Sequence, residues 1–313
     1  MLAFVTALPH PHNVRSYPRV GELLGRSLAG LERQTCDAFT IRIAGNGPAP
    51  IELPPSARWV DVDLEPAYPR PGPVPPEHLS TRVMRDKGLK LASGILAARD
   101  AAPSHYMLFD YDDLLSRRLA EHCRRHPDER GWYADRGYVY WEGSGRITAV
   151  RDFSEVCGSS FVLRRDLLSM PPALAAGSPP AEIAEAVGER FLVELLARHV
   201  TTRAYLRETG VELAPLPFPA AVWMRGTGEN ASRYAGYPSL LGTPVSDEIR
   251  DDFGLTTPPL SLRRDLAAFP AQALGAYPPL VRRFGLRRTV AMSFRDLGRR
   301  LGLGRERQAG RDT

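Results

Sequence analysis

Three carboxylates stand within four residues near the middle of the chain, Asp110, Asp112 and Asp113, directly after the apolar run 105–109. Carboxylates this close repel one another unless a cation compensates their charge. A divalent cation of the magnesium type suits that role, because such an ion takes a few carboxylates together with phosphate oxygens of a substrate. The spacing therefore predicts a metal-assisted diphosphate site. The alternative is that Asp113 caps a following helix and that the other two acids are solvated.

The segments before the carboxylates predict how these side chains are positioned. Strand and helix patterns follow one another in the order strand, helix, strand, strand, helix, strand, over residues 2–8, 19–35, 38–47, 57–64, 83–100 and 105–109. This order predicts an α/β fold with a doubly wound, mostly parallel sheet and helices on both faces. Open sheets of this kind bind ligands at the carboxyl ends of their strands, which is where Asp110 follows Phe109.

The chain after the carboxylates predicts a more β-rich region. The expected elements are a helix over 114–126, antiparallel strands over 131–142 and 145–153, a strand entering a helix in "CGSSFVLRRDLL", a helical pattern over 181–199 and a proline-broken edge strand over 211–223. Gly188 is expected to divide the helical pattern, because glycine is a weak point inside a helix.

A proline-rich loop and two lysines lie close to this framework. The loop 65–79 contains six prolines and predicts either a binding loop or a surface excursion. Lys87 and Lys90 are the only lysines of the chain, and both occur in the helix over 83–100. We expect Lys87, near the start of that helix, to contact a phosphate, and Lys90 to lie on a solvated face.

Composition places the chain among globular proteins. With 313 residues, of which 43% are hydrophobic, it is long enough for one large domain with a smaller appendage. Its apolar start is too short for a signal peptide, and no run approaches the roughly 18 apolar residues that span a bilayer. Cys36, Cys123 and Cys157 are odd in number and far apart, which predicts free thiols and a cytoplasmic location.

The net charge of +5 is unevenly distributed along the chain. Residues 281–313 hold ten arginines and three acids, a net charge of +7, so that residues 1–280 carry −2. The main body is therefore not expected to bind nucleic acid. The tail mixes arginine with apolar residues, which predicts either peripheral contact with an anionic membrane or a solvated packing helix. We expect a main domain over 1–235 and a helical, basic extension over 236–313.

Several motifs occur in a characteristic order. A helix ending "LERQT" precedes the strand "FTIRIAGNG", "KGLKLASGILAA" precedes "YMLFDYDD", and "GERFLVELL" precedes a late strand that is followed by "GTGENAS". This arrangement resembles the glycosyltransferases of the GT-A fold, in particular family-two-like enzymes, over roughly residues 2–235. The resemblance implies a nucleoside-diphosphate sugar as donor, a glycan or small-molecule acceptor, and a divalent manganese or magnesium ion.

The resemblance also assigns the donor and metal contacts. The D-x-D signature of the family corresponds to Asp110–Tyr111–Asp112, where Asp112 would bind the metal and Asp110 would contact the ribose or a metal-bound water. The residues implied in nucleotide binding are Ala7, Leu8, Arg15, Asn46, Asp61 or Asp63, and Lys87.

Two positions depart from the family pattern. The catalytic base is often the second residue of a Glu-Asp pair, but this chain has Glu189–Arg190, so the resemblance implies Glu189, with Asp152 and Glu155 as alternatives. A late histidine that contacts the metal or diphosphate is replaced by Thr227. His199 is expected to substitute for it; the alternative is a histidine placed at a helix end by the helix dipole.

The expected activity is metal-dependent transfer of a glycosyl group to an acceptor hydroxyl, with inversion of the anomeric centre. A metal ion stabilises the departing diphosphate and a carboxylate takes the acceptor proton. A nucleotidyltransferase is the first alternative, although "LPHPHNVRSYP" lacks the glycines of its loop after the first strand. A catalytically degenerate sugar-nucleotide-binding protein is the second.

Overall fold

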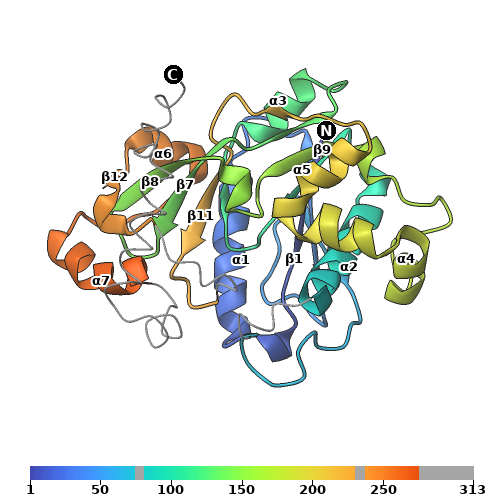
Figure 1. The fold of residues 1–313 in the computed structure, drawn as a ribbon, viewed down its shortest axis with the longest axis horizontal. Coiled ribbons are helices and arrows are strands. Elements are labelled where there is room, and N and C mark those ends of the chain that lie inside the picture. Colours follow the sequence, from blue (N-terminus) through green and yellow to red (C-terminus); the bar gives the residue numbers. More distant parts are fainter. Residues whose placement is uncertain (75–80, 230–236, 275–313) are drawn as a thin grey trace, which may run out of the picture.

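The first sheet contains the predicted parallel core. In the computed structural model, which describes residues 1–74, 81–229 and 237–274, four parallel strands lie in the order β3-β2-β1-β4. Figure 1 shows β1 near the middle of the molecule. They are β1 (Leu2–Ala7), β2 (Phe39–Gly45), β3 (Ala57–Asp61) and β4 (His105–Phe109). Beyond β4 the sheet continues with β9 (Phe161–Arg164), β6 (Gly131–Tyr133) and β10 (Ala214–Pro215). Only β9 runs antiparallel to its neighbours, so the sheet is mostly parallel.

Helices cover both faces of this sheet. On one face, α1 (Tyr17–Leu31) and α3 (Leu119–Arg125) pack into the same hydrophobic cluster as Leu2 and Phe4 of β1. On the other face, Ala3 and Val5 pack with α2 (Thr81–Ala97), α4 (Pro180–Val187), η6 (Phe191–Ala197) and α5 (His199–Glu208). Alternate residues of one buried strand thus enter two separate cores.

Helix α1 shows why these residues form the predicted element. The Ser16 hydroxyl accepts a hydrogen bond from the Arg19 N–H at 3.3 Å, which caps the helix, and Pro18 occupies its first turn. A buried stripe at helical spacing then faces the sheet: Val20, Leu23, Leu24, Leu28 and Leu31.

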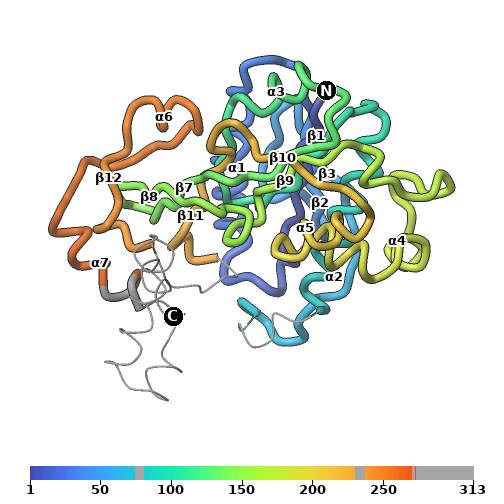
Figure 2. The backbone as a smooth tube through the Cα atoms, turned by 45° about the horizontal axis from the view of Figure 1, so that its top comes forward, coloured from blue at the N-terminus to red at the C-terminus, as the bar shows by residue number. Residues whose placement is uncertain are grey.

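A second, five-stranded sheet lies beside the first (Figure 2). Its order is β12-β8-β7-β11-β5, formed by β5 (Leu114–Leu115), β7 (Arg136–Trp141), β8 (Arg146–Arg151), β11 (Ala221–Arg225) and β12 (Thr243–Pro244). Residues 237–274 add β12, η7 (Ser239–Leu241), α6 (Asp247–Phe253) and α7 (Leu262–Leu274) to this part. The division at residue 235 stays a prediction, and the basic tail beyond 274 lies outside the described residues.

Several predicted boundaries are corrected. The expected helix over 114–126 is shorter, because Leu114 and Leu115 pair with β11 and the helix begins only at Leu119. The segment 131–142 forms two strands in different sheets, β6 and β7, and β9 enters a 3-10 turn in place of a helix. Gly188, with φ +79°, ends α4 as predicted. The edge strand expected over 211–223 is confirmed only in part: β10 lies at the edge of the first sheet, but residues 221–223 belong to β11, which lies between β7 and β5 in the second sheet.

The described part of the proline-rich loop is held by the turn after β1. The Asn13 amide donates to the Tyr68 carbonyl at 2.8 Å and accepts from the Tyr68 N–H at 3.2 Å. The Gly72 N–H donates to the His12 carbonyl at 2.8 Å. These bonds fix the first half of the loop beside the carboxyl end of β1; residues 75–79 lie outside the described residues.

Candidate functional site

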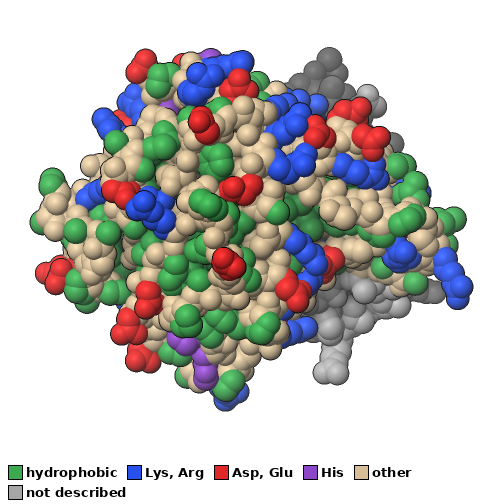
Figure 3. Space-filling model, turned by 180° about the vertical axis from the view of Figure 1, so that it is seen from behind, with side chains coloured by type: hydrophobic (Ala, Val, Ile, Leu, Met, Phe, Trp, Pro, Cys, Tyr) green, Lys and Arg blue, Asp and Glu red, His purple; other side chains and the backbone are tan. Residues whose placement is uncertain are grey.

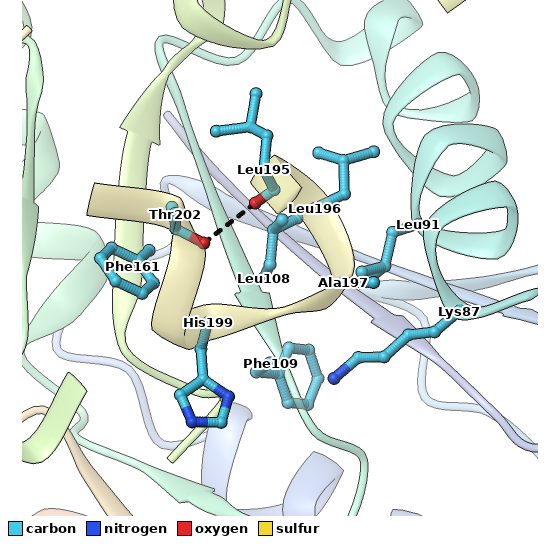
Figure 4. Close-up of a pocket in the computed structure, with 11 residues that line it drawn as sticks. Lys87, Leu91, Leu108, Phe109, Phe161, Leu195, Leu196, Ala197, His199 and Thr202 are labelled. Atoms are coloured by element: carbon cyan, nitrogen blue, oxygen red, sulfur yellow. Dashed lines mark hydrogen bonds between the residues drawn. The ribbon is translucent and has the colours of Figure 1, made fainter. Parts of the chain in front are cut away.

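The predicted site lies where strand β4 ends, and it gathers groups from three elements. Lys87 of α2 extends its ammonium to Asp110, with Nζ 2.5 Å from Oδ1. His199, the first residue of α5, lies on the other side of Phe109, and both side chains point towards the same edge of the sheet (Figure 4). The ring of His199 also hydrogen-bonds to the backbone of Glu155. The structure therefore brings together an acid, an ammonium and an imidazole that are far apart in the sequence.

The charges of this group depend on one another. Burial opposes the ionised form of Asp110, but the Lys87 ammonium outweighs it and holds the pKa of the carboxyl below its usual range. Burial likewise opposes the charged form of Lys87, yet Asp110 raises the pKa of the ammonium. Burial lowers the pKa of His199. At neutral pH the site thus holds an Asp110–Lys87 ion pair beside an uncharged imidazole.

The distance between Lys87 and His199 is set by a close backbone contact. Helix α2 passes η6 so closely that a Cβ added to Gly88 would lie 2.3 Å from the Leu192 carbonyl oxygen. Only glycine fits at this crossing. Because Gly88 follows Lys87 and η6 leads directly to His199, the contact fixes the two elements that carry these side chains.

Segment η6 is a π-helix, which is a rare element that is often found next to functional sites. Hydroxyl groups of α5 satisfy carbonyls at its end: Thr201 donates to the Glu194 carbonyl at 2.8 Å, and Thr202 donates to the Leu195 carbonyl at 3.1 Å. Thr202 lines the apolar pocket that lies behind Lys87 and His199 (Figure 4). The two threonines therefore support the turn on which His199 stands.

Asp113 has a structural role that differs from the predicted alternative of a helix cap. One of its oxygens accepts from the Ser159 hydroxyl at 2.7 Å and from the Cys157 thiol at 3.2 Å, and the other accepts from the Met224 N–H at 3.1 Å. Burial and the nearby Asp110 raise the pKa of Asp113 to about 7. This carboxyl joins the end of β4 to β11 and to the loop before β9, so the helix-cap interpretation is wrong.

The loop before β9 forms one wall of the site. A Cβ at Gly158 would lie 2.3 Å from an oxygen of Asp110, so the backbone is pressed against that carboxylate. The Ser159 hydroxyl accepts from the Asp110 N–H at 2.9 Å while it donates to Asp113. The sequence pattern predicted only a strand entering a helix in "CGSSFVLRRDLL" and did not reveal this bridge, because the partners are 49 residues apart.

The side chains at this edge of the sheet include donors that suit a metal ion. Burial and the carboxylates of Asp113 and Asp110 raise the pKa of Asp112 well above its usual value, so this group is stabilised by added positive charge. Within the described ranges, no three His, Cys, Asp or Glu side chains are gathered to hold a metal by themselves, so Asp110, Asp112 and His199 do not form a complete protein site. The residues fit an ion of the magnesium type that takes its other ligands from substrate phosphates and water. The metal itself stays a prediction.

The predicted nucleotide residues line the adjacent strand ends. Ala7 ends β1, and Leu8 is buried, so that it offers only its backbone. Asn46 donates to the Leu64 carbonyl at 2.7 Å, while its own buried carbonyl oxygen has no hydrogen-bond partner among the described residues. Asp61 accepts from the Gly47 N–H at 2.8 Å, and Asp63 is exposed. These positions follow the ends of β1, β2 and β3, as a nucleotide site in this fold requires.

Arg15 and Thr227 belong to a separate contact at the amino end of α1. The backbone N–H groups of Arg15 and Ser16 donate to the Glu229 carboxylate at 3.0 and 2.9 Å. Thr227 is buried, and its carbonyl accepts from the Arg19 side chain at 3.3 Å. An anion at this position is favoured by the helix dipole, and here the chain supplies it from Glu229. Sequence reasoning did not identify Glu229.

The proposed catalytic base lies outside the pocket. Glu189 is 49% exposed and forms an ion pair with Arg85 at 3.0 Å. Asp152 and Glu155 are both exposed, and the backbone of Glu155 contacts His199. Lys90, which was expected on a solvated face, is completely buried and pairs with Asp86 at 2.9 Å, so that expectation is wrong. The cause is that α2 is covered by the sheet on one side and by η6 on another.

Among the described residues no helix has the length and apolar character needed to cross a bilayer. Cys36, Cys123 and Cys157 are free thiols, as predicted.

Comparison with known proteins gives similarity at the level of solved structures. No protein-family model and no curated protein sequence matches the chain. TarS from S. aureus aligns with 71% of the chain at 9% identity and a TM-score of 0.36, and its fragment 1–349 at 10% identity and a TM-score of 0.33. A protein described as a nucleotide-diphospho-sugar transferase, from Desulfovibrio desulfuricans, aligns with 71% of the chain at 15% identity and a TM-score of 0.29.

The chain spans 36%, 60% and 80% of the lengths of these three proteins. With parallel strands in the order β3-β2-β1-β4, helices on both faces and the carboxylates directly after β4, the chain has the α/β fold with a mostly parallel sheet that its sequence predicted.

Proposed function

We propose that this chain is a metal-dependent glycosyltransferase that moves a sugar from a nucleoside-diphosphate sugar to an acceptor hydroxyl, with inversion. The observation that carries the proposal is the Lys87–Asp110–His199 group at the carboxyl end of β4, next to Asp112. Removing charged side chains from water lowers the stability of a folded protein, even when the charges are paired. Groups of this kind are therefore found mostly where a ligand binds. A sugar nucleotide has the diphosphate that such a site would bind.

Each group has a distinct part in this proposal. Asp112, with Asp110, would hold the divalent manganese or magnesium ion, which supplies Lewis-acid stabilisation of the departing diphosphate. Lys87 would orient the diphosphate through its ammonium, and His199 would hydrogen-bond to it as a neutral imidazole. The carbonyl oxygen of Asn46 would accept a hydrogen bond from the nucleobase, since it has no partner among the described residues. The acceptor would be a glycan or a small molecule.

Glu189 is the proposed base that takes the proton of the acceptor hydroxyl. Glu189 lies two residues before η6, and its half-exposed carboxylate pairs with Arg85 at the surface. An acceptor that enters over η6 would reach Glu189 from solvent. Glu155 is the alternative, because its backbone already contacts His199.

A catalytically degenerate sugar-nucleotide-binding protein is the second candidate. The Arg85–Glu189 pair and the buried Thr227 favour it, because the first occupies the proposed base and the second replaces a histidine of the family pattern. The two candidates share the donor site and differ only in turnover. Both would act in the cytoplasm, which the free thiols favour.

Thermal unfolding with a panel of nucleoside diphosphates, each with and without manganese, tests the donor site. We expect one nucleotide to raise the melting temperature only when the metal is present, because binding to the native state alone is stabilising. The nucleobase of that compound would identify the donor class. A panel without any metal-dependent shift would refute both candidates.

Turnover then separates the two candidates. With the donor class identified, Glu189→Gln should keep the metal-dependent thermal shift and lose transfer by about a hundredfold, as expected when a general base is removed. Glu185→Gln on the exposed surface of α4 is the matched control. Unchanged transfer in Glu189→Gln would move the base to another carboxylate, whereas a wild-type chain that binds donor but never turns over would support the degenerate protein.

A further inference from the structure

A small apolar pocket lies directly behind the Lys87–Asp110–His199 group. Four elements contribute to its apolar lining, which includes Leu91 of α2, Leu108 of β4, Phe161 of β9, and Leu195, Leu196 and Ala197 of η6 (Figure 4). This lining is buried throughout, and Leu108, which is 6% exposed, is its most accessible side chain. Protein interiors are packed about as densely as organic crystals, and they leave few voids of this kind. The pocket is therefore space that a ligand of the proposed site could fill.

The pocket opens beside the Asp110 carboxylate. Of the residues that line it, Lys87, Gly158 and His199 are partly exposed, and the others are buried. Lys87 bonds to Asp110, and the Gly158 backbone is pressed against the same carboxylate. His199 lies on the other side of Phe109 (Figure 4). A group that enters the pocket from solvent would therefore pass between these three residues and belong to a molecule that is bound at Asp110.

The pocket separates polar from apolar groups more sharply than the molecular surface does. Figure 3 shows acidic, basic and hydrophobic side chains mixed over one face of the molecule. In the pocket, Lys87 and His199 lie at the mouth, and Thr202 is the one polar side chain of the buried lining. Its hydroxyl already donates to the Leu195 carbonyl at 3.1 Å. A polar group deep in the pocket would thus lose its hydration and gain few hydrogen bonds, whereas an apolar group would be stabilised there.

The size of the pocket limits its occupant to a single small group. Its volume of about 10 Å³ is close to the least that one water molecule requires. A sugar ring or an alkyl chain is too large for this space. A water molecule would require roughly two to four polar partners, which the buried lining does not offer. A methyl group matches both the size of the pocket and its apolar lining.

We propose that this pocket selects a donor sugar that carries a methyl group, either the methyl of an acetamido substituent or the terminal methyl of a 6-deoxy sugar. This role rests on the proposed function, because the sugar is the part of the donor that is bonded to the diphosphate at Asp110. The methyl group would enter the pocket, and the polar atoms beside it would stay at the mouth near Lys87 and His199. A sugar with a hydroxyl group at that place would bury it among apolar side chains without a partner.

Donors that share one nucleobase test the proposal on the wild-type chain. With the nucleobase known from the nucleoside diphosphate panel, calorimetric titration with manganese compares the hexose, 2-acetamido and 6-deoxy conjugates in the gluco and galacto series. We expect one methyl-bearing donor to bind about tenfold more tightly than its hexose counterpart, because one methyl group in an apolar pocket changes affinity by about that factor. The donor that does so identifies the position of the methyl group. Equal affinity within each series would overturn the proposal and leave the nucleotide site intact, whereas a failure of every nucleoside diphosphate to bind would refute the proposed function and this role together.

Filling the pocket should remove the preference. Ala197→Val adds two methyl groups at the pocket wall, so the preferred donor should bind about tenfold more weakly, while the nucleoside diphosphate without a sugar binds as before. Ala186→Val, at an exposed position of α4, is the matched control and should keep the preference. Thermal unfolding checks that each variant is folded. A folded Ala197→Val protein that still prefers the methyl-bearing donor would overturn the proposal; if this variant does not fold, the donor comparison on the wild-type chain decides.

Discussion

The two ends of strand β4 carry titratable side chains whose surroundings are opposite in character. At the amino end, His105 is buried, bonds to the Glu129 carbonyl at 2.8 Å and packs against Trp132 with 5.1 Å between ring centroids. His122 lies 4.6 Å from the same indole. At the carboxyl end, Asp110 faces a charged Lys87 and an imidazole.

The pKa values show what the difference means. Burial lowers the pKa of His105, and it lowers the pKa of His122 to about 4, so both rings stay neutral and act as aromatic packing. At the other end Asp110 stays ionised, and Asp112 is kept close to two further carboxylates. One strand thus ends in a stable aromatic core and in a group of charges that is costly without a ligand. Substitutions at the two ends should therefore affect stability and activity differently.

The largest expected effect is on activity at the carboxyl end. Asp112→Asn removes the proposed metal ligand and should lower transfer by about a thousandfold. The same change removes a carboxylate from a repulsive group, so the free energy of unfolding should rise by about 1 kcal/mol. Steady-state transfer and urea unfolding of one protein sample measure both. A variant that loses stability together with activity would show that Asp112 is structural.

Substitution of Asp113 should lower the free energy of unfolding, which is the reverse of the effect expected at the neighbouring Asp112. Asp113→Ala leaves the Ser159 hydroxyl and the Met224 N–H without their buried acceptor and should cost about 3 kcal/mol of unfolding free energy. Asp113→Asn keeps an acceptor oxygen and should cost about 1 kcal/mol. Urea unfolding distinguishes the two. Equal losses in both variants would mean that the negative charge, and not the acceptor geometry, holds the three segments together.

The stability that the neutral histidines contribute at the amino end of β4 should depend on pH. Because the folded pKa of His122 is about 4, below its ordinary 6.5, protonation favours the unfolded chain. The stability that the neutral His122 ring contributes is complete above pH 6.5 and is lost as the pH falls towards 4. His122→Gln, which does not titrate, should reduce the stability difference between pH 7 and pH 4 by about 1 kcal/mol, allowing for the half-exposed ring. Parallel pH curves for wild type and variant would contradict this assignment.

The smallest effect concerns the support of His199. Thr202→Val removes the hydroxyl that bonds to the Leu195 carbonyl, and we expect about 1 kcal/mol loss of stability with a several-fold lower kcat. The KM for the donor should change little, because the hydroxyl bonds to the Leu195 carbonyl and not to the proposed substrate. Thr202→Ser retains the hydroxyl and should restore kcat. A valine variant with wild-type kcat would mean that α5 holds His199 without this bond.

The parallel core and the carboxylate group could be predicted from the sequence, because both depend on local patterns. Short segments rich in apolar residues identify β1 to β4, and Asp110 follows β4 directly, so its place at the sheet edge is fixed by the strand itself. Gly188 likewise acts through its own backbone.

Features that depend on contacts between distant segments could not be predicted. A two-residue strand such as β5 has no periodicity of its own and exists only because β11 pairs with it. Lys90 lies on a helix that is covered from two sides, which a one-sided amphipathic pattern does not represent. The roles of Ser159 and Glu229 arise from partners 46 and 213 or more residues away.

The contact between Gly88 and the Leu192 carbonyl has a consequence for sequence variation. In a library of random variants selected for transfer, Gly88 should be recovered almost without change, although its backbone touches no proposed substrate. Nearby pocket residues such as Leu195 and Leu196 should accept other apolar side chains, since volume-conserving exchanges are tolerated. Invariance at Gly88 would then report the spacing of two helices, and it should not be taken as the mark of a residue that takes part in the chemistry.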